Sequence, residues 1–125
     1  MKSSFDSFKY NVVKLPRFEV RTGRLQIIRN EEGNPILKKD GTPLLKQKGV
    51  DMALGIDVAR LSATHQIQKI ILIAGDSDFI PAIITAKQEG ILVSLYYYDF
   101  VHDSLYDVCD DRFQITKEML IKCKR

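Results

Sequence analysis

The chain has 125 residues, enough for one domain with a single hydrophobic core but too few for two domains of ordinary size. Its hydrophobic and charged fractions, 45% and 28%, exclude wholesale disorder, and no apolar run approaches the roughly 18 residues of a membrane span. The net charge of +3 is uneven, because residues 1–49 carry eleven Lys and Arg against five Asp and Glu, and residues 50–125 carry eight against eleven. This asymmetry fits a polyanion-binding surface beside a cation-binding site, or simply a solvated surface.

The first fifty residues predict short extended segments joined by turns. Turn signals at Thr22-Gly23, Asn34-Pro35 and Asp40-Gly41 separate the runs RFEVRTGRLQIIR and GNPILKKDGTPLLKQKG. We therefore expect β-hairpins in this half. The N-terminal segment MKSSFDSFKY lacks the apolar core of a signal peptide, and Cys109 and Cys123 form neither a metal-type spacing nor a disulfide framework, so a reducing cytoplasm is expected.

The second half alternates helix and strand signals. Apolar residues crowd a helix over residues 49–64, and a β-branched run predicts a buried strand over residues 69–74. The following elements are a helix from Pro81 that ends at Gly90, a strand over 91–98, a short helix near 104–109, a strand over 112–116 and a lysine-rich helical tail. Such alternation predicts an α/β fold with a mainly parallel sheet and helices on both faces.

Two carboxylates, Asp76 and Asp78, follow the predicted strand over residues 69–74 in the stretch IAGDSDFIP. Ligands of open parallel sheets bind outside the carboxyl ends of the strands. A single carboxylate at this position can cap the next helix, but two close carboxylates repel each other unless a cation or a basic group lies between them. The pattern therefore predicts a cation-binding or catalytic role for both.

Further acids come from the segment KQKGVDMALGIDVARL. Asp51 lies at the start of the predicted helix, where it can act as an N-cap, and Asp57 lies inside the helix, where an ion pair with Arg60 would account for it. Oxygen ligands without His or Cys suit Mg²⁺ or Mn²⁺, which assist phosphodiester cleavage. His65 and His102 have no partner at catalytic spacing and are expected to be surface or loop residues.

The segment KGVDMALGIDVARL, followed by IILIAGDSDFIPAIITAKQEGILV, resembles the NYN domain family, which belongs with the PIN-like nucleases and includes LabA-like proteins. The segments LPRFEVRTGRL and LYDVCDDRFQI extend the resemblance over roughly residues 15–116. It implies a Rossmann-like three-layer sandwich of PIN-like type and metal-dependent cleavage of RNA. We thus expect one domain over residues 1–125: a basic, hairpin-rich part over 1–49, an α/β core over 50–116 and a basic tail over 117–125.

The resemblance also implies roles for single residues. Asp51, Asp76 and Asp78 match the acidic metal cluster of the family, with Mg²⁺ or Mn²⁺ as the cofactor, and these three residues and Asp57, the acid within the helix, are the expected catalytic residues. Ser77 lies where its hydroxyl or amide could contact a phosphate. Lys48 precedes the cluster and could position Asp51 or the RNA.

The family pattern begins with a strand that ends in Asp, and this sequence has no apolar strand before Asp6. The domain is therefore expected to be incomplete at its N-terminus, with the strand over residues 69–74 exposed at a sheet edge that favours a homo-oligomer. Residues 10–15, YNVVKL, could supply a substitute strand. The alternative to a nuclease is a non-catalytic RNA-binding or regulatory module with a degenerate site.

Overall fold

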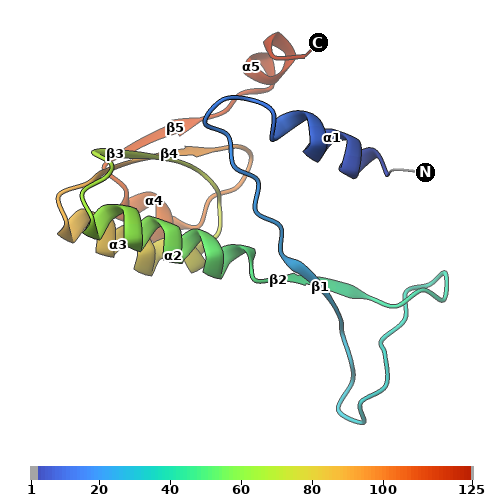
Figure 1. Ribbon diagram of the computed structural model, residues 1–125. Helices are drawn as coiled ribbons and strands as arrows, with labels where there is room; N and C mark the ends of the chain where they lie inside the picture. Colours follow the sequence, from blue (N-terminus) through green and yellow to red (C-terminus); the bar gives the residue numbers. More distant parts are fainter. Residues whose placement is uncertain (1–2, 125) are drawn as a thin grey trace. The chain divides into compact units, whose positions relative to one another are not determined.

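The computed structural model describes residues 3–124, so Met1, Lys2 and Arg125 of the expected domain lie outside the described part. The chain divides into two compact units, Met1–Val50 and Asp51–Arg125. Among the described residues, no helix is long and apolar enough to cross a membrane. The helices and strands follow in chain order (Figure 1): α1 (Ser4–Val12), β1 (Arg24–Ile27), β2 (Leu45–Lys48), α2 (Val50–Ala63), β3 (Lys69–Ile73), the 3₁₀ helix η1 (Ser77–Phe79), α3 (Ile80–Gln88), β4 (Leu92–Tyr97), α4 (Asp103–Val108), β5 (Asp111–Gln114) and α5 (Lys117–Lys122).

The first unit begins with a helix that the sequence reasoning did not predict. Ser3 caps α1, because its hydroxyl accepts a hydrogen bond from the backbone N–H of Asp6 at 3.1 Å while the Asp6 carboxylate accepts one from the Ser3 N–H at 3.2 Å. The hydrogen bonds from Ser3 hold the pKa of Asp6 below its usual value. The suggestion of a substitute strand over residues 10–15 is therefore wrong, since this capping box starts a helix that runs through Val12.

The predicted hairpin in the first unit is confirmed. β1 and β2 pair antiparallel, and single bridges join Arg29 to Pro35 and Leu37 to Pro43 beyond them. The turn at Asp40-Gly41 forms as predicted, with Gly41 at a φ of 83° and the Asp40 carboxylate accepting a hydrogen bond from the Thr42 N–H. Thr22-Gly23 forms no turn and instead leads into β1.

The second unit contains a parallel sheet in the order β3-β4-β5. The predicted elements are confirmed, with shifts of one or two residues at their ends. Gly90, with a φ of 79°, follows the C-terminal end of α3, as predicted. The α/β class predicted from the alternating pattern is thus correct. Both strands at the ends of this order, β3 and β5, are sheet edges within the part of the chain that the structure describes.

The hydrophobic core lies on one face of this sheet. The buried side chains come from β3 and β4, from the helices α3 and α4 on this face (Figure 1), and from residues next to these elements, namely Leu72, Ile83, Ala86, Ile91, Val93, Leu95, Leu105 and Cys109, with Leu54 and Val58 of α2 packed against them. The opposite face carries exposed apolar side chains, including Ile71 and Ile73 of β3. Within residues 51–124, a parallel sheet is thus flanked by helices, as expected from the sequence, and α2, α3 and α4 supply the core on one of its faces.

The two cysteines are free thiols, as the sequence predicted. Cys109 is buried in the core and Cys123 is exposed. Burial raises the pKa of the Cys109 thiol above its ordinary value. Cys109 therefore acts as a small core residue and not as a reactive group.

Candidate metal centre

Asp76 and Asp78 lie at the carboxyl end of β3, where the chain turns into η1. Asp76 has extended backbone angles, and its Oδ1 accepts a hydrogen bond from the backbone N–H of Asp78 at 3.1 Å. Asp76 is therefore the N-cap of η1, which is the structural role considered for one of the two acids. Capping uses a single oxygen of Asp76 and leaves the second oxygen and the Asp78 carboxylate without a structural explanation.

Asp51 completes the group from the first turn of α2. One carboxylate oxygen from each of Asp51, Asp76 and Asp78 lies within 4.8 Å of the others, and all three side chains are exposed. Within residues 51–124, none of the three forms an ion pair with Lys or Arg. Three like charges at this separation repel one another, so the arrangement favours a bound cation.

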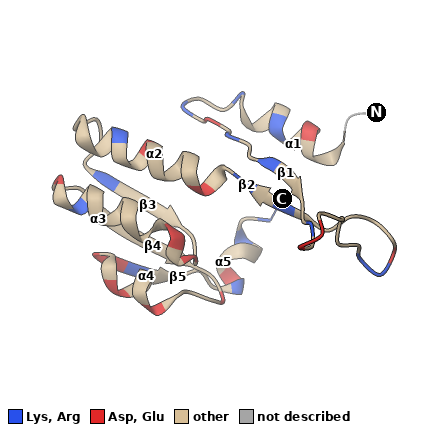
Figure 2. Cartoon of the chain, turned by 90° about the horizontal axis from the view of Figure 1, so that it is seen from below, with Lys and Arg blue, Asp and Glu red and all other residues tan. Residues whose placement is uncertain are grey.

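The donor set fits a hard divalent cation. All three donors are carboxylate oxygens, which suit Mg²⁺ and Mn²⁺, and the exposed position leaves room for water and substrate ligands. Figure 2 shows the acidic colouring at the start of α2 and after β3, and the basic colouring on β1 and β2 of the first unit. The three-acid group predicted from the sequence is thus present in the second unit.

Two hollows border this group. One, with a volume of about 480 Å³, lies between α2 and α3; it includes Asp51 and Asp78 and is otherwise mostly apolar. The other, of about 300 Å³, includes Asp76 and Ser77 together with Gly75, Phe100 and His102. The group of carboxylates therefore faces space that a ligand larger than a metal ion can enter.

The remaining predicted site residues lie in different surroundings. Asp57 is not part of the three-acid group; its carboxylate lies 3.8 Å from the Arg60 guanidinium, which is the ion pair that the sequence suggested as its alternative role. Ser77 lines the smaller hollow beside Asp76. Lys48 ends β2 in the first unit, on the hairpin.

His102 is an exposed loop residue, as expected from the sequence, but sequence reasoning did not place it in the hollow beside Asp76. It is the N-cap of α4, where its Nδ1 accepts a hydrogen bond from the Ser104 N–H at 3.3 Å. Because Nδ1 is the acceptor, the neutral ring carries its proton on Nε2 and offers a donor. Phe100, 72% exposed, lines the same hollow. The sequence signal was the segment YDFVHDS. It follows β4, which pairs in parallel with β3, so the segments after the two strands lie at the same edge of the sheet.

Gly75 allows the loop that carries Asp76 to lie close to the backbone of Phe100. A Cβ at this position would lie 2.6 Å from the Phe100 carbonyl oxygen, and the Gly75 carbonyl accepts a hydrogen bond from the His102 N–H at 3.1 Å. We expect Gly75→Ala to lower the free energy of unfolding by about 1–3 kcal/mol, because backbone atoms must move apart. The same movement displaces Asp76 and should weaken manganese binding. Urea unfolding and a metal titration measure the two effects.

Gly55→Ala is the matched control for this prediction. Its added Cβ would meet only the Ala82 Cβ, at 3.9 Å, which is an ordinary contact. Because Ala is the better helix former by about 0.8–1.0 kcal/mol, this variant should be as stable as the parent or more stable. Equal stability of the two glycine variants would contradict the assigned role of Gly75.

A family model described as the NYN domain matches residues 11–117. The matched segment covers most of the chain and spans both units. Neither the curated proteins nor the solved structures contain a match to this chain.

Proposed function

Because the chain belongs to the NYN domain family of PIN-like nucleases, we propose that it is a cytoplasmic, divalent-metal-dependent endoribonuclease that cleaves RNA phosphodiesters. The observation that carries this proposal is the convergence of Asp51, Asp76 and Asp78 within 4.8 Å, without an ion-pair partner among residues 51–124. We further propose that both units act together as one domain, in keeping with the family match across them.

The mechanism assigns roles to the residues of the chain. Asp51, Asp76 and Asp78 would hold Mg²⁺ or Mn²⁺. A cation bound there would supply positive charge where the attacking and leaving oxygens of a phosphodiester become negative. The Asp76 carboxylate is held against the backbone of η1 by its hydrogen bond from the Asp78 backbone N–H.

The surroundings of the carboxylates support the binding of an RNA strand. Ser77 and His102 line the hollow beside Asp76, and both side chains carry donors for phosphate oxygens or base edges. Phe100 offers an exposed ring in the same hollow, on which a base can stack. Lys48, on the hairpin of the first unit, is proposed as a separate cation for the phosphate backbone. Asp57 would assist catalysis indirectly, by stabilising α2 through its ion pair with Arg60.

Manganese binding tests the cation site without depending on catalysis. A cation that binds the folded state alone stabilises it by about 2.7 kcal/mol at a concentration 100 times its Kd. We expect manganese to raise the melting temperature accordingly, whereas a monovalent salt of equal ionic strength should not. Cleavage of unstructured RNA should require manganese or magnesium and stop in EDTA.

The outcome separates the proposed nuclease from the alternative, a non-catalytic RNA-binding module. A melting-temperature shift with cleavage supports the nuclease. A shift together with RNA binding but without cleavage would show that the site is degenerate. No shift at all would count against the cation site itself.

A further inference from the structure

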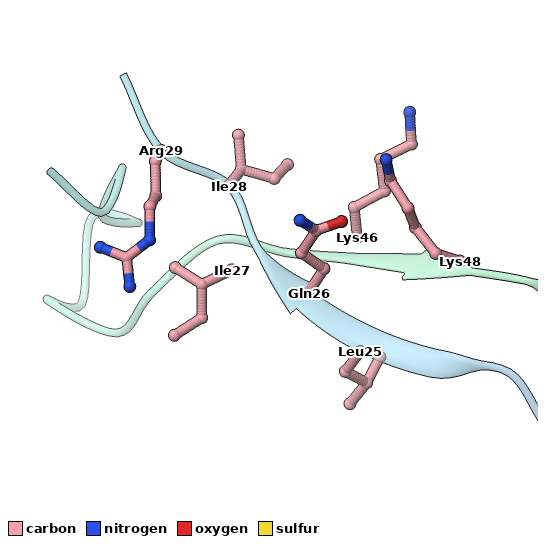
Figure 3. A pocket seen from close by; sticks show the side chains of 7 residues that line it. All are labelled: Leu25, Gln26, Ile27, Ile28, Arg29, Lys46 and Lys48. Atoms are coloured by element: carbon pink, nitrogen blue, oxygen red, sulfur yellow. The ribbon is translucent and has the colours of Figure 1, made fainter. Parts of the chain in front are cut away.

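The hairpin of the first unit has one basic face. In the antiparallel ladder, Arg24 lies opposite Lys48 and Gln26 lies opposite Lys46. Directly opposed residues point to the same side of a sheet, and residues two apart on one strand do so as well, so these four side chains share a face. Figure 3 shows Gln26, Lys46 and Lys48 pointing to one side of the strands and Leu25 to the other.

The pairing of Arg24 with Lys48 is unfavourable by itself. Like charges directly opposite each other destabilise an antiparallel pair, and their Cβ atoms are typically about 5 Å apart. Lys46 adds a third cation on the same face, at the next position of β2. Within residues 3–50, none of these three cations forms an ion pair with Asp or Glu, although Arg21 and Glu19 do so at 3.1 Å.

The same strands line a hollow of about 630 Å³, to which this face contributes Gln26, Lys46 and Lys48; Leu25, Ile27, Ile28 and Arg29 also line it (Figure 3). Arg29, whose guanidinium donates a hydrogen bond to the Gly33 carbonyl at 2.9 Å, lies on the side of Ile27 and is not part of this face (Figure 3). Lysines two residues apart on a strand are about 6.6 Å apart, since the rise is about 3.3 Å per residue. This separation is close to that of successive phosphates along an extended single strand.

We propose that this basic hairpin face, formed by Arg24, Gln26, Lys46 and Lys48, binds the phosphodiester backbone of single-stranded RNA. The inference rests on the proposed function for its substrate class, but it concerns a site in the first unit that contains no carboxylate of the metal centre. The phosphates relieve the repulsion between Arg24 and Lys48, and the Gln26 amide, which lies opposite Lys46, donates a further hydrogen bond to the backbone. The face reads no base sequence, because its contacts are with the backbone.

The test is the salt dependence of RNA binding, measured by fluorescence anisotropy with labelled oligouridylate in EDTA, where cleavage does not interfere. Each contact between a lysine and a phosphate of a single strand contributes about 0.7 to the slope of log K against log salt. Lys46→Gln with Lys48→Gln should therefore lower the slope by about 1.4. The matched control is Lys38→Gln with Lys39→Gln, which removes the same charge from an exposed part of the same unit and should leave the slope nearly unchanged.

The results separate this inference from the proposed nuclease activity. Equal slopes for the two double variants would overturn the hairpin site, whether or not the protein cleaves RNA in manganese. A reduced slope only in the Lys46 and Lys48 variant supports the site, even if cleavage is never observed. Equally tight, lysine-dependent binding to phosphatidylserine vesicles would overturn the assignment to RNA and indicate an anionic membrane surface as the ligand.

Discussion

Asp76→Asn should reduce manganese-dependent RNA cleavage about a hundredfold to a thousandfold, because one of three carboxylates that hold the cation loses its charge. Asparagine keeps the side-chain oxygen that caps η1, and Asn and Asp are equivalent N-caps, so the loop after β3 should retain its conformation. The apo protein should be as stable as the parent or slightly more stable, since repulsion from Asp51 and Asp78 is relieved. Cleavage rates and melting curves with and without manganese measure these effects.

Asp107→Asn is the matched control. Asp107 is an exposed aspartate of α4 that lies outside the three-acid group, and its replacement changes the net charge by the same amount. It should preserve both cleavage and the manganese-dependent stabilisation. If Asp76→Asn retains the activity of this control, the three carboxylates do not form the catalytic centre.

The exposed edge of β3 is expected to determine the oligomeric state of the protein. This strand pairs only with β4 among the described residues, and its outer edge carries unpaired backbone groups next to Ile71 and Ile73, which are 64% and 71% exposed. An apolar strand edge of this kind pairs with another chain. We expect the protein to form a homodimer in which β3 pairs antiparallel with β3 of a second copy. A two-fold axis at Ile71 would place Lys69 opposite Ile73, so the lysines would not oppose each other.

Ile71→Lys should convert this dimer into a monomer. The substitution would bring two lysines directly opposite each other across the two-fold axis, and lysine at an edge strand prevents pairing. Folding should be little affected, because the Ile71 side chain is already exposed. Light scattering gives the mass of each variant in solution. Ile121→Lys, at a 61% exposed position of α5, is the matched control and should remain dimeric; a monomeric parent would refute the edge pairing.

The metal centre could be predicted from the sequence because its parts follow local rules. The apolar run that forms β3 ends at a glycine, and the acids after it must lie at the carboxyl end of a parallel strand. Asp51 opens a helix crowded with apolar residues, so its place at one end of α2 was also clear. That Asp57 pairs with Arg60 followed from their spacing on the helix.

Other features depend on contacts that spacing does not reveal. The capping box of Ser3 and Asp6 decides between helix and strand for residues 10–12, although the run YNVV favours a strand. The opposition of Arg24 and Lys48 depends on the register of β1 and β2, and the connection between these strands contains two further turns. The approach of Gly75 to the Phe100 carbonyl joins two loops that are separate in the sequence.

The parallel ladders have a consequence for the order of folding. They join strands that are near in sequence, since Lys69 pairs with Leu92 and Ser94 pairs with Asp111, and we expect the sheet to form before α2 docks, because these loops are moderate in length. Asp76 and Asp78 reach their positions when the sheet forms, because they follow β3 directly. Asp51 reaches its position when α2 packs on the sheet through Leu54 and Val58. We therefore expect the three charges to meet late, after the folding barrier, so that a bound cation stabilises the native state without stabilising the transition state. Metal should then slow unfolding and leave the folding rate nearly unchanged.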